Sequence, residues 1–201
     1  DLATAEKMHA IFLEIVIAPS FTDEAYDVLA KKKNIRLLTV DFAKINPTKP
    51  DMVSVLGGML VQERDLMHEN ESEYKVVSKK QPTEQQMKSL AFAQNSVKHV
   101  KSNAIVVTTD NQTLGIGSGQ PNRIDSTKNA IKKAEVKPNY ANAVLGSDAY
   151  FPMDDCVEYA AKHGITAIVE PGGSIRDQDS IDKADELGIA LVFSGNRHFK
   201  H

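Results

Sequence analysis

The sequence predicts an α/β domain in which helices cover both faces of a layered, mixed β-sheet. Three observations lead to this fold class. Short apolar, β-branched runs alternate along the chain with amphipathic helical patterns. Two such runs, 165–169 and 189–193, flank one predicted helix, which is typical of a parallel βαβ unit. Two others, 104–108 and 113–117, are joined by the turn 110–112, so the sheet is expected to be mixed.

Local signals place the remaining elements in order. Pro19 ends a first strand, Thr83 and Gln86 form a capping box, and Gly164 and Gly188 stop the last two helices. We expect helices at 4–13, 22–30, 83–97, 124–134, 155–163 and 179–187. Further strands are expected at 14–18, 35–40 and within 57–66, and loops at 44–51, 68–82 and 136–143.

Composition excludes several classes of protein. The 201 residues suit one sizeable domain or two small ones. Hydrophobic residues make up 41% and charged residues 25%, which excludes a disordered tail, a coiled coil and a collagen-like chain. The longest strongly apolar run, 189–193, is too short to span a membrane. The net charge is −3 and the 24 basic residues form no single stripe, so nucleic acid is not an expected partner.

The single cysteine, Cys156, excludes an internal disulfide and a CxxC zinc site, and it indicates the reducing cytoplasm. Without a clear histidine partner, we interpret Cys156 as a structural residue rather than a nucleophile. The chain begins with Asp1 and not with Met, which we interpret as the edge of a piece of a longer protein.

Four polar clusters each allow a functional and a structural interpretation. The cluster 98–103 either lines a site or caps the helix before it. In the cluster 115–123, the glycines either let the backbone approach a ligand or form an irregular strand end, and Asn122 and Arg123 at the start of the next helix suit an anion or an amide. The run 147–155 either holds a flat heteroaromatic ring, or begins a helix with Phe151 in the core and Asp154 or Asp155 as the cap.

The fourth cluster pairs the turn 171–174 with the C-terminal residues 195–201. Exposed turn amides and the cations of the C-terminus suit a phosphate group. An untethered basic tail is the alternative interpretation, although an apolar strand leads directly into it.

Several of these stretches occur in one order and together resemble a known family. They are Gly115 to Gln120 with Arg123, then Ser147 to Pro152, then Pro171 to Asp177, then Arg197 to Phe199; the stretches 17–21 and 31–38 extend the likeness toward the start. The chain resembles the C-terminal part of the bifunctional AICAR transformylase/IMP cyclohydrolases, especially bacterial members. The resemblance implies that 1–201 is a cytidine-deaminase-like C-terminal lobe of the transformylase domain, without the first lobe and the cyclohydrolase domain.

The resemblance also implies a reaction and its residues. The formyl group of the co-substrate 10-formyltetrahydrofolate is transferred to the amine of AICAR, and Asn103 is the implied catalytic residue. Substrate contacts are implied for Glu14 near the ribose, Tyr150 at the carboxamide and Arg197 at the phosphate. Folate contacts are implied for Arg123, Ile124, Pro152, Met153 and Asp155. A monovalent cation such as K⁺ is implied at Ser102, Asp148 and the backbone of 198–200, and a homodimer is implied for the full-length enzyme.

The sequence departs from the family in one important respect. The Lys-His pair followed by Asn-Pro-Cys-Gly, which supplies the family's main catalytic groups, is absent, and Lys98-His99 does not replace it because it ends a helix. We therefore expect no transformylase activity from this chain alone. The alternatives are a nucleotide- or folate-binding module, a purely structural piece, and a zinc nucleoside deaminase, which a single cysteine disfavours.

Overall fold

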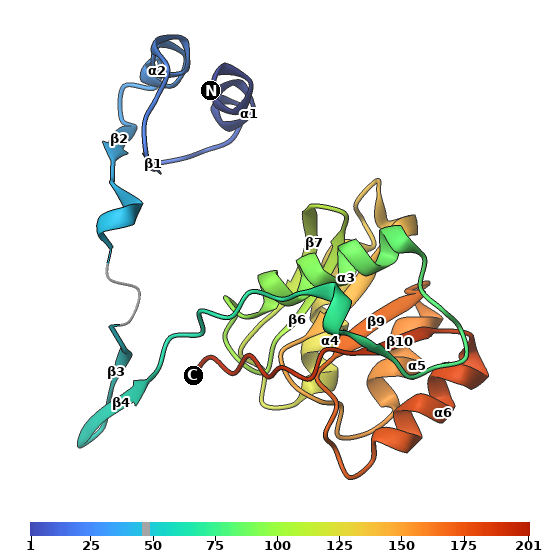
Figure 1. Ribbon diagram of the computed structural model, residues 1–201. Helices are drawn as coiled ribbons and strands as arrows, with labels where there is room; N and C mark the ends of the chain where they lie inside the picture. Colours follow the sequence, from blue (N-terminus) through green and yellow to red (C-terminus); the bar gives the residue numbers. More distant parts are fainter. Residues whose placement is uncertain (46–48) are drawn as a thin grey trace. The chain divides into compact units, whose positions relative to one another are not determined.

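The computed structural model describes residues 1–45 and 49–201 and divides the chain into two compact units, Asp1–Arg64 and Asp65–His201 (Figure 1). Each unit is described by itself. Within the described residues, no helix combines the length and the apolar character needed to cross a membrane.

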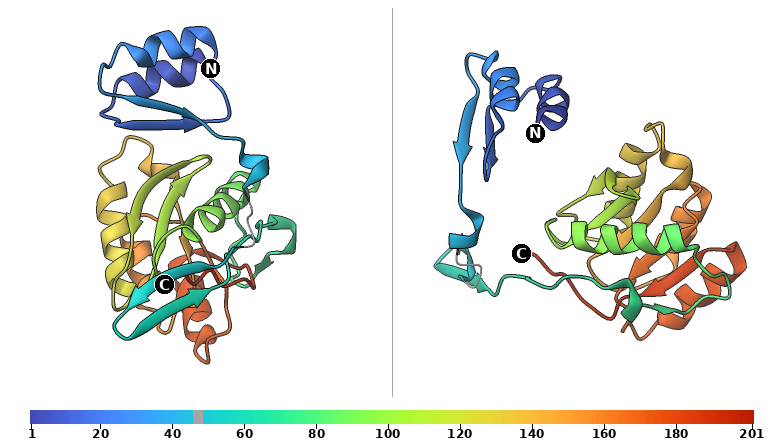
Figure 2. Two further views of the ribbon diagram at one scale, coloured as in Figure 1. Left: turned by 90° about the vertical axis from the view of Figure 1, so that its left-hand side faces the viewer. Right: turned by 45° about the horizontal axis from the view of Figure 1, so that its top comes forward.

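The first unit begins with two helices on a two-stranded parallel sheet. As Figure 2 shows, α1 (Leu2–His9) and α2 (Asp23–Ala30) lie on one face of β1 (Ile15–Ala18) and β2 (Arg36–Thr39). The side chains of Asp1 and Thr22 cap the helices by accepting hydrogen bonds from backbone N–H groups. The first helix therefore starts and ends earlier than the expected 4–13. The core of this layer is small, and its buried members are Ala5, Ala25 and Leu29.

A 3-10 turn, η1 (Phe42–Lys44), and an antiparallel hairpin of β3 (Asp51–Val55) and β4 (Gly58–Gln62) complete the first unit. The strand expected within 57–66 is β4. Its partner β3 has no counterpart in the prediction, because all its residues are exposed and its sequence carries no clear alternation. Of the expected loop 44–51, residues 46–48 lie outside the described residues.

The second unit contains a mixed six-stranded sheet with the strand order β5–β10–β9–β8–β6–β7. The three strands β8, β9 and β10 are parallel, whereas β5 and β6 run antiparallel to their neighbours. The bounds are β5 (Lys75–Val76), β6 (Ile105–Thr109), β7 (Gln112–Gly117), β8 (Val144–Ser147), β9 (Ala167–Glu170) and β10 (Ala190–Phe193). The predicted α/β class with a mixed sheet is confirmed, including parallel pairing of the last two strands.

Helices cover both faces of this sheet. α3 (Glu84–Val97) packs on one face, and α4 (Arg123–Ala134), α5 (Asp155–Lys162) and α6 (Asp177–Leu187) cover the other (Figure 1). Successive strand residues point to opposite faces, so Leu145 joins the core under α4, α5 and α6, whereas Val144 packs with Leu90 of α3. The expected helices on both faces are confirmed.

The structure tests two local predictions, the capping box at Thr83 and the close approach at the glycines of β7. The capping box of α3 is confirmed: the Gln86 N–H donates to Thr83 Oγ1 at 3.1 Å, and the Thr83 N–H donates to Gln86 Oε1 at 2.9 Å. The glycines of β7 face α4, and a Cβ at Gly117 would lie 1.9 Å from the Ser126 carbonyl oxygen. At Gly117 the close approach is therefore to a helix backbone and not to a ligand.

Two strands of the sheet have no counterpart in the prediction. β5 has only two residues and lies in the expected loop 68–82 together with the 3-10 turn η2 (Glu71–Glu73). β8 has four residues and follows the expected loop 136–143, which contains η3 (Tyr140–Asn142). Pairing with neighbouring strands, rather than a local pattern, produces both strands.

Candidate functional site

A pocket of about 330 Å³ opens in the second unit, beside the start of α4 and the segment that follows β8. Four of the expected site residues line it, namely Asn103, Arg123, Tyr150 and Pro152, together with Pro121, Asn122, Ala149 and Phe199. The lining thus joins the polar residues before β6, the start of α4, the aromatic run and the C-terminal segment. Tertiary structure brings together residues from all four clusters of the sequence at this point.

Behind the pocket, Arg123 and Asp148 form a buried ion pair. Their side chains are 5% and 0% exposed, and Arg123 Nη1 donates to Asp148 Oδ1. The same nitrogen donates to Ser147 Oγ at 3.0 Å. A buried charge is tolerated only when it is paired, so the guanidinium is committed to this network. Arg123 therefore contributes to the wall of the pocket rather than offering a free cation.

Asn103 is held in a fixed orientation. Its Oδ1 accepts a hydrogen bond from Arg123 Nη2 at 2.8 Å, which identifies this atom as the oxygen because a guanidinium can only donate. Its Nδ2 donates to the carbonyl oxygens of Gln120 at 2.9 Å and Pro121 at 3.2 Å. Donation from this amide to a ligand therefore requires one of these carbonyl contacts to be given up.

Tyr150 and Arg197 stack on each other. The guanidinium carbon of Arg197 lies 5.3 Å from the centre of the Tyr150 ring, a cation–π arrangement. Among the described residues, Arg197 forms no ion pair, and its side chain is exposed. A Cβ at Gly173 would lie 3.2 Å from Arg197 Nη2, so the turn passes close to the guanidinium. Arg197 is therefore available to an anion.

The amides of the turn after β9 are already occupied. The N–H of Gly172 donates to Glu170 Oε2 at 3.0 Å, and the N–H groups of Gly173 and Ser174 donate to the Asp177 carboxylate at 2.7 and 2.9 Å. The interpretation of this turn as an anion-binding loop is therefore wrong, because internal carboxylates already accept from these donors.

The residues of the expected cation site lie together. Ser102 Oγ donates to Asp148 Oδ2, the Lys200 N–H donates to Ser102 Oγ at 3.1 Å, and the His198 N–H donates to the Asp148 carbonyl at 2.8 Å. Hydroxyl, carboxylate and carbonyl oxygens form a donor set that fits a hard cation. In the part of the chain that the structure describes, no group of three or more His, Cys, Asp or Glu residues is arranged to hold a metal ion.

The other expected ligand contacts do not line the pocket. Ile124 is half-buried and packs against the core under α4, α5 and α6. Met153 is 47% exposed, and Asp155 is half-buried at the first residue of α5. Glu14 belongs to the first unit, where it is exposed directly before β1.

The neighbouring residues follow the structural interpretations. Phe151 is fully buried, as one interpretation expected, whereas Asp154 stands at the cap of α5 without a side-chain capping bond. Lys98 is the C-cap residue of α3, and its Nζ donates to the Met67 carbonyl. Burial raises the pKa of Cys156 to about 12, which keeps the thiol protonated and makes it a poor nucleophile.

A second polar cluster beside the C-terminal segment has no counterpart in the prediction. His198 is 1% exposed, with Nδ1 2.5 Å from Asp65 Oδ2 and Nε2 2.8 Å from Glu69 Oε1. Burial alone lowers the pKa of His198, but the hydrogen bonds with Glu69 and Asp65 outweigh burial and raise it. The expected cation cluster of the C-terminus is therefore divided, because His198 turns inward to carboxylates. The sequence feature that points to this buried cluster is the pair of carboxylates at positions 65 and 69.

Glu170 is a further buried acid that the sequence did not single out. Its Oε2 accepts from the N–H groups of Phe151 at 3.3 Å and Gly172 at 3.0 Å, whereas Oε1 has no hydrogen-bond partner among the residues that the structure describes. Burial raises the pKa of Glu170 to about 7. This carboxyl ties the aromatic run to the turn after β9.

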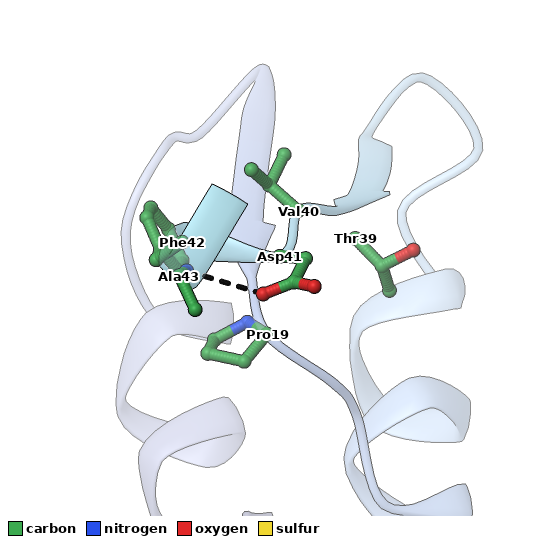
Figure 3. Close-up of a pocket in the computed structure, with 6 residues that line it drawn as sticks. All are labelled: Pro19, Thr39, Val40, Asp41, Phe42 and Ala43. Carbon is green, nitrogen blue, oxygen red and sulfur yellow. Dashed lines mark hydrogen bonds between the residues drawn. The ribbon is translucent and has the colours of Figure 1, made fainter. Parts of the chain in front are cut away.

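A larger pocket of about 450 Å³ lies in the first unit and is lined by Pro19 and residues 39–43 (Figure 3). Its one lining carboxylate, Asp41, points to the backbone and accepts from the Ala43 N–H at 3.1 Å. Asp41 also pairs with Lys44 at 3.2 Å. None of the expected site residues lines this pocket, so we place the candidate site in the second unit.

The fold and the pocket define an α/β protein with a mixed sheet and a site beside the start of β6 and the end of β8. Residues 1–133 match the family model described as AICARFT/IMPCHase bienzyme. The chain belongs to this family of bifunctional purine biosynthesis proteins. It is 67% identical over 201 residues to the bifunctional purine biosynthesis protein PurH of Leuconostoc mesenteroides subsp. mesenteroides, and 66% identical over 202 residues to that of Pediococcus pentosaceus.

These matches include the whole of this chain but only 40% of the length of each relative. Among solved structures, a dCMP deaminase from the cyanophage S-TIM5 matches with a TM-score of 0.35 and 19% identity, over 48% of this chain and 85% of that one. A score this low carries no argument about function.

Proposed function

We propose that this chain is the C-terminal lobe of the AICAR transformylase domain, and that its pocket contributes to transfer of formyl from 10-formyltetrahydrofolate to AICAR. The observation that carries the proposal is the pocket lined by Asn103, Tyr150 and Pro152, with Arg197 over the Tyr150 ring. These residues come from separate parts of the chain, and each stands where the family resemblance implies a ligand contact.

Different groups would bind the two substrates. Arg197 offers an exposed planar guanidinium, which suits the AICAR phosphate better than a lysine would. The Tyr150 backbone and Glu14 would contact the carboxamide and the ribose. The folate would contact Arg123 and Pro152 in the pocket wall. It would also contact Ile124 and Met153 outside that lining, with the Asp155 carboxylate at the pterin ring.

The chemistry requires orientation and stabilisation of charge. The AICAR amine is a poor nucleophile, because its lone pair is delocalised into the imidazole and the carboxamide. The site must hold the amine against the formyl carbon, remove a proton and stabilise the developing oxyanion. Asn103 Nδ2 is the proposed neutral donor to that oxygen, and it would exchange a carbonyl contact at Gln120 or Pro121 for the ligand.

A monovalent cation such as K⁺ fits the same region. Ser102 Oγ, Asp148 Oδ2 and the backbone of 198–200 would hold it. When bound, this ion supplies a positive charge that orders the segment carrying Arg197. Zinc has no part in the proposal.

We expect this chain to bind substrates without turning them over, because the family's Lys-His pair followed by Asn-Pro-Cys-Gly is not among its residues. Calorimetric titration of the 201-residue chain with AICAR and with a folate analogue tests binding. We expect Arg197→Ala to weaken AICAR binding about tenfold or more, since a charge-assisted phosphate contact is lost, and to leave the folate analogue unchanged.

Assays of both family activities on the same sample complete the test. Transformylase turnover would contradict the expected inactivity, and cyclohydrolase turnover would assign this segment to the other half of the family's activities. A chain that binds neither ligand would be a structural piece.

A second candidate function is ligand binding without any catalytic contribution from Asn103. It is favoured by one observation, namely that both N–H groups of that amide already have acceptors. An Asn103→Ala substitution in the full-length protein separates the two candidates. Loss of kcat with unchanged substrate affinity supports catalysis, whereas an unchanged kcat supports binding alone.

We propose a cytoplasmic homodimer for the full-length protein, with AICAR and folate as its partners and neither nucleic acid nor membrane among them. The exposed apolar side chains of β3 and β4 offer a surface that a second subunit could cover. Light scattering at high protein concentration tests this expectation, and a monomeric mass for the full-length protein would contradict it.

A further inference from the structure

The C-terminal segment after β10 has two different sides. Asn196 and His198 turn toward the segment 65–74, whereas Arg197 stacks on Tyr150 and Phe199 lines the pocket. Figure 1 shows this C-terminal segment, in dark red, leaving the sheet after β10. Side chains of an extended chain point alternately to opposite sides. The contacts of residues 196 and 198 therefore set the direction in which residues 197 and 199 point.

Glu69 is the centre of the contacts on the inner side. Its Oε1 lies 2.8 Å from His198 Nε2 and accepts from Asn196 Nδ2 at 3.1 Å, while its Oε2 accepts from the Tyr74 hydroxyl at 2.8 Å. The Glu69 N–H donates to Asn95 Oδ1 of α3 at 3.2 Å, which anchors the segment to a rigid helix. The Glu69 and His198 side chains are both 0% exposed. These hydrogen bonds are thus formed away from water, where each is strong and costly to break.

We propose that Glu69 is a positioning residue that holds the C-terminal segment through Asn196 and His198, and thereby aims Arg197 and Phe199 at the pocket. Among the described residues, Glu69 is not part of the lining of the pocket beside Tyr150. Asp65 adds a second contact to His198, on its other ring nitrogen. The identity of the ligand rests on the proposed function, whereas the positioning rests on these contacts alone.

The first readout needs no ligand. Trypsin cleavage after Arg197 releases 198–201 and is followed by intact mass. We expect Glu69→Ala to raise the cleavage rate about tenfold or more, because His198 and Asn196 lose their buried acceptor. Glu69→Gln keeps an acceptor oxygen, so we expect it to restore most of the protection. Glu71→Ala, an exposed acid in the same segment, is the matched control and should cleave like the unmodified chain.

The second readout is calorimetry with AICAR and with the folate analogue. We expect Glu69→Ala to weaken AICAR binding about tenfold and folate-analogue binding by a clearly smaller factor, because Arg197 is the proposed phosphate contact whereas Phe199 is one of several residues that line the pocket. We expect Glu69→Gln to recover AICAR binding. A purely structural role would weaken both ligands by the same factor and would overturn the proposal. Unchanged cleavage in Glu69→Ala would also overturn it.

Two milder variants keep the proposal testable if Glu69→Ala does not fold. Asn196→Ala and Tyr74→Phe each remove one contact to Glu69, and we expect a smaller rise in cleavage from each. If neither changes the cleavage rate, the proposal is wrong. If the unmodified chain binds no AICAR, the proposed function fails, while the cleavage comparison still decides the role of Glu69.

Discussion

The two units of this chain differ in how they bury their apolar side chains. In the second unit, Ile105, Leu145, Ile168 and Leu191 are all fully buried between the sheet and its helices. In the first unit, the hairpin exposes large apolar side chains, with exposed fractions from 43% to 106%: Met52, Val53, Val55, Leu56, Met59, Leu60 and Val61. The second unit therefore contains the burial needed for its own stability, whereas the first needs a surface to cover it.

The largest expected effect comes from separating the units. We expect residues 65–201 alone to unfold cooperatively, because they keep the six-stranded sheet and all its helices. We expect residues 1–64 alone to show no cooperative transition, since their buried core is small. Thermal unfolding followed by circular dichroism measures both. A cooperative transition in the isolated first unit would break the comparison.

The next effect tests the buried charges of the second unit. Asp148→Asn removes the charge that neutralises Arg123 and leaves a buried cation unpaired, so we expect a loss of about 3–5 kcal/mol. Urea unfolding measures this change in free energy. The control is Asp179→Asn, which breaks the exposed pair with Arg176 and should cost less than about 1 kcal/mol. Equal effects would mean that the buried pair is not a stability determinant.

Glycine substitutions compare packing in the two units directly. A Cβ at Gly117 would meet the backbone of α4 at 1.9 Å, so Gly117→Ala should destabilise the second unit by about 1–3 kcal/mol or more. A Cβ at Gly58 in the hairpin would meet none of the described residues within 4 Å, so Gly58→Ala should change the free energy of unfolding by less than about 0.5 kcal/mol. Urea midpoints of the two variants measure the difference, which disappears if α4 can move away from β7.

The pH dependence of stability tests Glu170. Its pKa is raised from 4.5 to about 7, so the folded state prefers the protonated carboxyl. The stabilising contribution is complete below pH 4.5 and is lost as the pH rises through about 7. Glu170→Gln should remove this pH dependence. Relative to the unmodified chain, the unfolding free energy of the variant should be roughly 1–3 kcal/mol larger at pH 8 than at pH 5. Denaturation at both pH values measures it, and parallel pH profiles of the two proteins would contradict the expectation.

The smallest expected effect lies at the tip of the hairpin. Leu56 is fully exposed, so Leu56→Ser should change the unfolding free energy of this chain by less than about 0.5 kcal/mol. In the full-length protein the same change should weaken self-association, if a second subunit covers the hairpin. Light scattering of the full-length variant distinguishes these outcomes, because an unchanged mass would show that Leu56 stays exposed there as well.

Long elements with complete local signals are predictable from this sequence. The capping box at Thr83 and the stop at Gly188 set the limits of α3 and α6, because each depends on contacts only a few residues apart. β5 and β8 are not predictable, because they exist through pairing with strands far away in the chain. β3 is missed for a different reason, since a hairpin exposed on both faces carries no burial pattern.

The candidate site shows the same division. Residue types and their order were enough to single out Asn103, Arg123, Tyr150 and Arg197, because the family resemblance is carried by short contiguous stretches. The sequence alone could not show that Asp148 neutralises Arg123 or that internal carboxylates occupy the turn amides. It also could not show that Glu69 holds His198, 129 residues away.

The sequence by itself determined the α/β class and the long helices and supplied the candidate site residues, since these depend on periodicity, capping and short motifs. Only the tertiary structure decided which charges are free and which are already paired. Arg197 is available and Arg123 is not, although both were expected to contact ligands. The physical reason is that burial and pairing depend on partners brought together by the sheet, and local sequence does not specify those partners.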